Sequence, residues 1–161
     1  MSVADARTGV LFVCLGNICR SPLAEGIFIH LARERGVLDR LLVDSAGTGG
    51  WHVGNRADPR SIAVANKHGI ELPSRARTFD DGGAEAERFP WLIAMDKQNQ
   101  RDMIARGAPR DSVHLMLSFH PDPPTDEVPD PYYGGDDGFD RVYTMLTKAC
   151  EGLIDAVIGF R

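Results

Sequence analysis

The sequence predicts an α/β fold built on a four-stranded parallel β-sheet with helices on both faces. Two observations lead to this prediction. Short, continuously apolar runs are typical of strands that are buried on both faces, and they occur at 10–13, 41–43, 91–95 and 113–116. Helical patterns lie between these runs, and alternation of strands with helices produces a parallel sheet. With 161 residues and no repeat or linker, residues 1–161 are expected to form a single domain.

The first strand is followed by a short loop and a helix. The apolar run 10–13 ends at Cys14, and the chain then passes through Gly and Asn. Ser21 is a good helix N-cap and Pro22 suits the first helical position. The sequence therefore predicts a helix over 22–35, ended by Gly36.

The next segment contains the second strand, a glycine-rich loop and the second helix. The strand at 41–43 runs into a polar and glycine-rich stretch that continues to Asn55. Asp58 and Pro59 are typical of a helix start, and Gly69 is expected to end that helix. The basic segment 71–78 is expected to be irregular.

The third and fourth strands complete the predicted sheet. A short helix is expected over 80–88, before the strand at 91–95. Asp96 is expected to cap a further helix that ends near Gly107. The fourth strand follows at 113–116.

A long loop separates the fourth strand from the last helix. Residues 118–138 contain five prolines and three glycines, and a loop of this length within a domain is usually functional or disordered. The final helix is predicted over 139–158. Its core-facing residues are expected to be Val142, Leu146, Leu153 and Val157.

The loop after the first strand has the features of a phosphate site. It lies between the carboxyl end of a strand and the amino end of a helix, where unpaired N–H groups and the helix dipole favour an anion. The same field favours the thiolate form of Cys14. Arg20 adds a planar fork of donors that suits two phosphate oxygens. Neither of the common glycine-rich nucleotide-binding patterns is present.

Composition excludes several functional classes. A net charge of −5 argues against general binding of nucleic acid or acidic membranes. Three cysteines are too few for a secreted disulfide framework, and the first residues lack a signal-peptide core, so a reduced, cytoplasmic location is expected. The histidines show no spacing typical of a metal site, and we expect no cofactor.

Residues 10–22 (VLFVCLGNICRSP) resemble the signature of the low molecular weight protein tyrosine phosphatases. The resemblance extends to 44–48 (DSAGT), 51–55 (WHVGN) and 130–134 (DPYYG), and it covers essentially the whole chain. It implies the strand order 2-1-3-4. It also implies hydrolysis of phosphotyrosine in proteins and binding of phosphate or vanadate in the loop. Trp51 in place of the tyrosine common in eukaryotic members suggests a bacterial type.

The resemblance also assigns roles to individual residues. Cys14 would be the nucleophile and Arg20 a phosphate ligand. The loop residues that would contact the substrate are Leu15, Gly16, Asn17, Ile18, Cys19 and Ser21. Trp51, Tyr132 and Tyr133 would form the walls of the cleft. Ser45 and His68 would support the loop through Asn17, with Ser21 donating to the thiolate.

The residue pattern alone leaves alternatives open for two roles, that of the general acid and that of the second cysteine. Asp130 and Asp122 both precede a proline in the long loop, and only the resemblance identifies Asp130 as the general acid and base. Cys19 lies five residues from Cys14 and either packs beneath the loop or captures an oxidised Cys14 as a disulfide. The resemblance favours the protective role.

Three other functions compete with hydrolysis. An arsenate reductase would need further cysteines to relay a disulfide, but the chain has none between Cys19 and Cys150. A non-catalytic phosphotyrosine-binding module would not need Cys14 or Asp130. A thiol redox protein would usually contain a Cys-x-x-Cys motif, which is absent.

Overall fold

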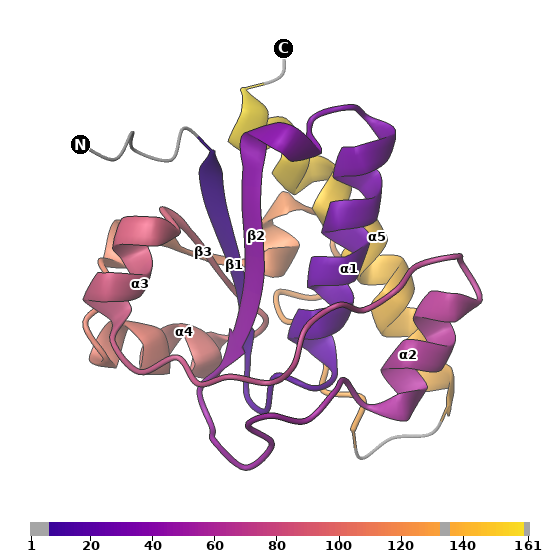
Figure 1. Ribbon diagram of the computed structural model, residues 1–161, viewed down its shortest axis with the longest axis horizontal. Helices are drawn as coiled ribbons and strands as arrows, with labels where there is room; N and C mark the ends of the chain where they lie inside the picture. Colours follow the sequence, from indigo (N-terminus) through magenta and orange to yellow (C-terminus); the bar gives the residue numbers. More distant parts are fainter. Residues whose placement is uncertain (1–6, 133–135, 160–161) are drawn as a thin grey trace.

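The centre of the sheet is strand β1 (Thr8–Cys14), which pairs in parallel with a strand on each side. Its neighbours are β2 (Leu41–Gly47) and β3 (Trp91–Ala94), and β3 also pairs with β4 (Val113–Leu115). The order β2-β1-β3-β4 confirms the predicted single-domain α/β fold (Figure 1). The structure is a computed structural model, and it describes residues 7–132 and 136–159.

Helices cover both faces of the sheet (Figure 1). One face carries α1 (Arg20–Glu34), α2 (Pro59–Asn66) and α5 (Asp136–Ile158), and the other carries α3 (Gly82–Arg88) and α4 (Lys97–Ala105). Short 3-10 turns occupy Leu38–Arg40, Arg110–Ser112 and Met116–Phe119.

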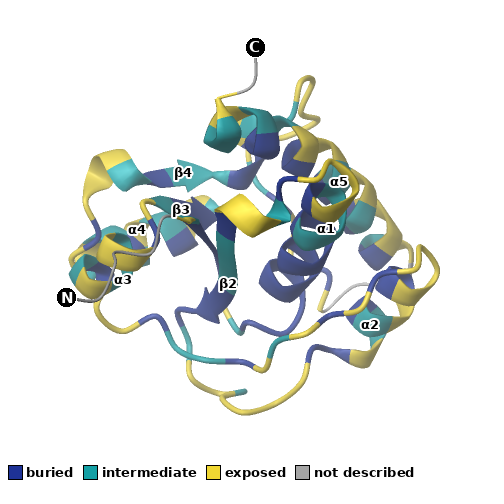
Figure 2. Ribbon diagram, turned by 45° about the horizontal axis from the view of Figure 1, so that its top comes forward, coloured by how far each residue is buried: buried dark blue, intermediate teal, exposed yellow. Residues whose placement is uncertain are grey.

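Strand β1 contributes to two separate hydrophobic clusters, one on each face. Val10 and Phe12 pack with α1 and α5, whereas Leu11 and Val13 pack towards α3 and α4. All four side chains are fully buried, which explains why the run is continuously apolar rather than alternating. In Figure 2 the strands lie between the helical layers, and the edge strands β2 and β4 carry intermediate as well as buried residues. The loop after β1 therefore begins from a strand that is paired on both edges and buried on both faces.

Several predicted helix boundaries are confirmed by their hydrogen bonds. Asp58 caps α2 by accepting from the N–H of Arg60, and Asp96 forms a capping box with Asn99 at the start of α4. After α1, Gly36 has a φ of 71°, and the next N–H returns to a carbonyl of the last turn. This left-handed conformation stops the helix where the sequence predicts.

Several other predicted boundaries are wrong. The first strand extends beyond 10–13 to Thr8–Cys14. The second strand extends beyond 43 to Gly47, because pairing with β1 continues through polar residues. The last helix begins at Asp136 rather than 139. Ser21 is not the N-cap of α1, which begins at Arg20 after Cys19 and has no side-chain cap. The Ser21 hydroxyl is instead engaged inside the loop.

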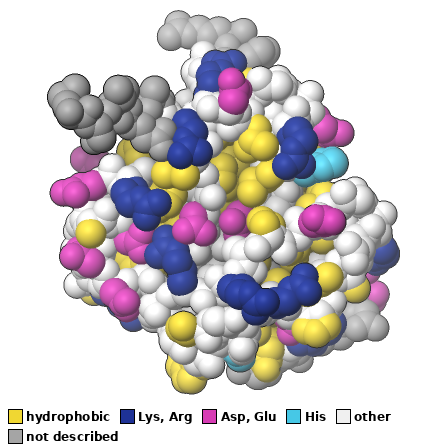
Figure 3. All heavy atoms as spheres, viewed as in Figure 1, with side chains coloured by type: hydrophobic (Ala, Val, Ile, Leu, Met, Phe, Trp, Pro, Cys, Tyr) yellow, Lys and Arg dark blue, Asp and Glu magenta, His cyan; other side chains and the backbone are white. Residues whose placement is uncertain are grey.

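The surface has mixed charge on the face that carries β2, α1 and α2. Acidic and basic side chains are interspersed there (Figure 3). Within 7–132 and 136–159, no helix has both the length and the hydrophobicity needed to cross a bilayer.

Candidate active site

A cavity of about 370 Å³ opens at the carboxyl end of β1, where the chain turns into α1. The chain moves from β1 to β2 on one side and later to β3 on the other, and open α/β sheets bind ligands at such a switch point. The lining residues are Cys14, Leu15, Gly16, Ile18, Cys19, Arg20, Trp51, His52, Asp130 and Tyr132. All except His52 are site residues predicted from the sequence.

The loop that forms the floor of this cavity has unpaired backbone donors. Within the described part of the chain, the N–H groups of 15–19 have no hydrogen-bond acceptor. The carbonyls of Cys14 and Leu15, in contrast, accept from the N–H groups of Thr48 and Gly49 at 3.0 and 2.7 Å. The loop is therefore fixed through its acceptors while its donors remain available, which suits it to bind an anion.

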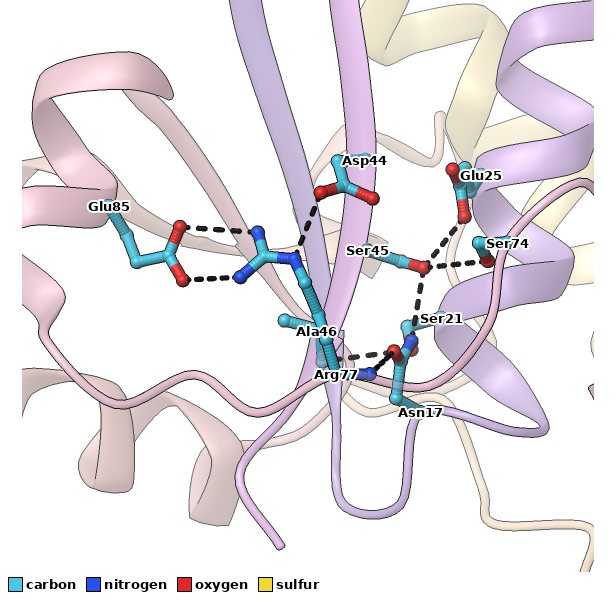
Figure 4. Close-up of polar contacts among 9 residues, drawn as sticks. All are labelled: Asn17, Ser21, Glu25, Asp44, Ser45, Ala46, Ser74, Arg77 and Glu85. Atoms are coloured by element: carbon cyan, nitrogen blue, oxygen red, sulfur yellow. Dashed lines mark hydrogen bonds and ion pairs between the residues drawn. The ribbon is translucent and has the colours of Figure 1, made fainter. Parts of the chain in front are cut away.

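Asn17 holds the loop in this conformation. It is the only non-glycine residue with a positive φ in the described ranges, at 57°, a region that Asn tolerates. Its Nδ2 donates to Ser21 Oγ at 2.8 Å and to Ser45 Oγ at 3.0 Å, and its Oδ1 accepts from the N–H of Arg77 at 3.0 Å. The hydrogen bond from Asn17 to Ser45 that the resemblance implies is thus present (Figure 4).

The sulfur of Cys14 has a hydroxyl beside it. Ser21 Oγ lies 3.0 Å from Cys14 Sγ. Because this hydroxyl already accepts from Asn17, its proton is available for the sulfur, and its other acceptor, the carbonyl of Ala46, is more distant at 3.5 Å. The arrangement stabilises negative charge on the sulfur.

A buried carboxyl group ends the chain of hydrogen bonds behind the loop. Glu25 is 3% exposed, and Ser45 Oγ donates to its Oε1 at 2.6 Å. Ser74 Oγ lies 3.3 Å from the same Ser45 hydroxyl, beside Glu25 (Figure 4). Burial raises the pKa of Glu25 to about 7, although the two hydroxyls and the charge of Arg77 oppose the shift.

The prediction that His68 supports the loop through Asn17 is wrong. His68 is exposed just beyond the end of α2, where its ring stacks on Tyr143 of α5 with the centroids 3.9 Å apart. Ser74 stands in the network instead. The irregular segment 71–78 brings it there by pairing beside the end of β2, with Gly47 donating to the carbonyl of Arg77 at 2.8 Å.

Arg20 is buried, at 3% exposed, and is held in one orientation. Its Nη1 donates to Asp96 Oδ2 at 2.7 Å and to the carbonyl of Val128 at 3.0 Å. Burial works against its charge, but the negative charge of Cys14 and the hydrogen bond and charge of Asp96 outweigh it, so the pKa of Arg20 is raised. The guanidinium is therefore a fixed cation next to the sulfur.

Asp130 reaches the cavity and Asp122 does not. Asp130 Oδ2 lies 3.8 Å from Arg20 Nη2, and Asp130 Oδ1 accepts from the N–H of Tyr132 at 3.0 Å. The side chain is 34% exposed, so it also contacts solvent. Asp122 lines a separate hollow against α5, together with His120. The structure thus separates two aspartates that the residue pattern alone leaves equivalent.

Aromatic side chains stand at the rim. Trp51 is 72% exposed and Tyr132 is partly exposed, and both line the cavity. His52 also lines the cavity, with its ring 6.4 Å from the ring of Tyr132. The predicted wall residue Tyr133 lies outside the described residues.

Cys19 lines the cavity but is mostly buried. Burial raises its pKa, and the negative charges of Asp58, Cys14 and Asp130 raise it further. Cys19 is therefore a neutral thiol, and all three cysteines, including Cys150, are free. Among the described residues, no group of His, Cys, Asp and Glu side chains is arranged to hold a metal ion.

Four contributors to the site are absent from the sequence-based predictions of site residues. Asp96 could have been found, because it lies two residues beyond the end of β3 and so at the same edge of the sheet as Cys14. The others are Glu25, Ser74 and His52. Glu25 is one polar residue on a helix that carries many, and nothing in the sequence indicates that it faces inward.

Comparison with known proteins gives a consistent result. Residues 9–158 match the family model described as "Low molecular weight phosphotyrosine protein phosphatase". A low molecular weight protein-tyrosine-phosphatase of Streptomyces coelicolor is 43% identical over 154 residues, covering 92% of each chain. The corresponding phosphatase of Schizosaccharomyces pombe is 41% identical over 152 residues, covering 92% of this chain and 96% of its own.

The same likeness extends to solved structures. A protein tyrosine phosphatase from Entamoeba histolytica, crystallised with Hepes in the active site, superposes with a TM-score of 0.88 at 37% identity. That match covers 94% of this chain and 98% of the other.

Proposed function

The chain belongs to the low molecular weight phosphotyrosine protein phosphatase family and is a hydrolase of that family, and we propose that it cleaves phosphotyrosine in proteins through a covalent bond to Cys14. The observation that carries the proposal is the convergence of a hydroxyl-supported thiol, unpaired loop N–H groups, a fixed arginine and an aspartate on one cavity.

In the first step the Cys14 thiolate attacks phosphorus and the bond from phosphorus to the tyrosyl oxygen breaks. The loop N–H groups of 15–19 and the guanidinium of Arg20 bind the equatorial oxygens, whose charge they offset. Asp130 gives its proton to the leaving tyrosyl oxygen. The products of this step are a protein tyrosine and a phosphocysteine.

In the second step water attacks the phosphocysteine. Asp130, now a carboxylate, takes a proton from that water, the sulfur–phosphorus bond breaks, and phosphate leaves. Ser21 Oγ, 3.0 Å from the sulfur, supports the departing thiolate. Arg20 and the loop amides provide the positive charge for both steps, so the proposed mechanism needs no cofactor.

Selectivity for tyrosine is proposed to come from the rim. Trp51 and Tyr132 line the cavity above the thiol, and we propose that they and Tyr133 enclose the phenyl ring. The shorter side chain of phosphoserine would not carry its phosphate from this rim to the buried sulfur. Asn17 and Ser45 are proposed as supporting residues, on the strength of the hydrogen bonds that fix the loop.

The thiol chemistry also bears on redox behaviour and location. We propose that Cys19 captures an oxidised Cys14 as a reversible disulfide. Support comes from the position of both residues on the wall of one cavity. A nucleophile that works only as a free thiol suits a reducing compartment, and we propose the cytoplasm.

The test is turnover of p-nitrophenyl phosphate and of a phosphotyrosine peptide without added metal. Wild type should hydrolyse both and be inhibited by vanadate. Cys14→Ser should lose turnover but still bind phosphate, whereas Arg20→Ala should lose both. Absence of turnover by folded, reduced wild type, with phosphotyrosine binding retained, would instead indicate a binding module. Arsenate-dependent oxidation of thiols would indicate a reductase.

A further inference from the structure

Arg60, at the start of α2, contacts the segment that follows Asp130. Its Nη2 donates to the carbonyl of Tyr132 at 3.0 Å. Its guanidinium carbon also lies 5.4 Å from the ring centroid of Tyr132 and 4.6 Å from that of Phe139, which begins the buried part of α5. Cation–π contacts of this kind favour one orientation of the guanidinium. Arg60 thus joins α2, the loop after Asp130 and α5.

Asp58 fixes the direction of this arginine. The Asp58 carboxylate accepts from Arg60 Nε and Nη2, both at 3.1 Å, and from the backbone N–H of Arg60 at 2.8 Å. The hydrogen bonds and charge of Arg60 outweigh partial burial and lower the pKa of Asp58, so the pair stays ionised near neutral pH. A two-point ion pair holds a planar guanidinium more firmly than a single contact does.

The start of α2 is itself attached to the phosphate-site loop. The N–H of Asp58 donates to the carbonyl of Ile18 at 2.7 Å, and Ser61 Oγ donates to the carbonyl of Cys19 at 3.3 Å. Asp58 and Arg60 therefore connect the loop that carries the nucleophile with the loop that carries the acid.

Asp130 lies midway between two carbonyls that arginines hold. Arg20 donates to the carbonyl of Val128, two residues before Asp130, and Arg60 donates to the carbonyl of Tyr132, two residues after it. Among residues 7–132 and 136–159, the side chain of Asp130 accepts a single hydrogen bond, from the N–H of Tyr132 in the same turn. The position of its carboxylate therefore depends on how firmly both flanking carbonyls are held.

We propose that Arg60 is a positioning residue, which with Asp58 sets the distance of the Asp130 carboxylate from the reacting oxygens. The inference rests on the proposed function. This positioning role also explains why residue 60 is an arginine. A neutral side chain could not contact the Asp58 carboxylate, the Tyr132 carbonyl and two aromatic rings at once. Loss of Arg60 should let the acid drift while the phosphate-site loop stays intact.

The test compares Arg60→Met with wild type on two aryl phosphates. One substrate has a basic leaving group that needs a proton, and the other has an acidic leaving group that does not. Because misplacing a catalytic group by about 1 Å can cost roughly 10²-fold, kcat/KM should fall about tenfold or more for the first substrate and by less than about twofold for the second. The dissociation constant for vanadate should stay within about twofold of wild type, since the loop donors are unchanged.

A double variant distinguishes a role of Arg60 in positioning Asp130 from a general loss of rigidity at the site. In the Asp130→Asn background, adding Arg60→Met should cause little further loss of kcat/KM, because a residue that acts through Asp130 has nothing left to position.

Arg60→Lys keeps the charge but not the planar fork. It should lose part of the same activity, and it provides the measurement if the Met variant unfolds. Arg75→Met is the matched control, since Arg75 is an exposed arginine that donates to the carbonyl of Gly54 at 3.1 Å, and it should behave as wild type.

Two results would overturn the inference. One is an equal loss for both leaving groups. The other is a loss in the Asp130→Asn background as large as in wild type. Turnover by wild type that depends on Cys14 tests the proposed function separately, so the function can stand when the role of Arg60 fails.

Discussion

Replacing Glu25 with Gln tests how the protein holds a carboxyl group behind its phosphate-site loop. Glu25 is buried on α1, and it accepts a hydrogen bond from the hydroxyl of Ser45 rather than from a cation. Arg77 is nearby, but its guanidinium is bound by Asp44 and Glu85 (Figure 4). The ionised form of Glu25 is therefore poorly compensated in the folded state.

The size of the effect follows from the shift in pKa. Burial raises the pKa of Glu25 from an ordinary 4.5 to about 7. At about 1.4 kcal/mol per pKa unit, a shift of this size destabilises the folded state by about 3 kcal/mol at a pH above both pKa values. Below pH 4.5 the group is protonated in both folded and unfolded states, so there is no penalty. As pH rises from there through about 7, the unfolded state loses its proton first and the folded state is progressively destabilised.

The assay is urea unfolding of wild type and Glu25→Gln at a series of pH values. Gln stays neutral and can still accept from Ser45, so the difference between the two proteins isolates the titration of Glu25. The wild type should lose about 3 kcal/mol relative to the variant between pH 4.5 and pH 8, and the difference should be constant outside that range. Glu87→Gln, a change at an exposed residue of α3, should give a difference that does not vary with pH in this way. A pH-independent difference for Glu25→Gln, or one in which wild type gains stability as pH rises, would refute the reasoning.

Three further predictions concern the acid, the second cysteine and the packing of α5. Asp130→Ala should lower kcat/KM by about 10²-fold or more for leaving groups that need a proton, whereas Asp122→Ala should stay close to wild type; equal losses would contradict the assignment. After peroxide and then a dithiol reductant, wild type should recover activity and Cys19→Ser should not; equal recovery would leave Cys19 as a packing residue. Gly152→Ala should destabilise the fold by about 2 kcal/mol or more in thermal unfolding, because its Cβ would lie 2.0 Å from the carbonyl oxygen of Phe119; an unchanged melting temperature would show that α5 shifts freely.

The sequence predicts most of the fold because the strongest signals are local. The apolar run in β1 reflects burial on both faces, and Gly36 reflects a backbone conformation that other residues adopt at a cost. The length of β2 is underestimated because the signal in its second half is not local. Its second half contains Asp44 and Ser45, which have low or neutral strand propensity but are paired with β1 and engaged by side chains from elsewhere in the chain.

Partners distant in the sequence explain what is missed at the site. Asp96 is predicted only as a helix cap, yet its Oδ1 accepts from the N–H of Asn99 while its Oδ2 holds Arg20, 76 residues away. Ser74 reaches the network only because an irregular segment returns beside β2. His68 has the residue type that the resemblance suggests but not the position, since a ring stacked on Tyr143 is held away from the loop. The sequence pattern and the family resemblance identify which types of residue a site needs. The tertiary fold determines which of those residues come into contact.

The floor of the cavity is buried and its rim is exposed, and this difference affects how the protein can evolve. Asn17 and Ser21 at the floor, and Ser45 behind it, are buried, and Asn17 donates hydrogen bonds to both serines, so most substitutions there cost both stability and chemistry. Trp51 and its neighbour Val53 are exposed, and surface changes of this kind usually cost little stability. Substrate preference can therefore drift, or be redesigned, at the rim without disturbing the reaction below it. Libraries directed at 51–53 should yield folded, active variants far more often than libraries directed at 15–21.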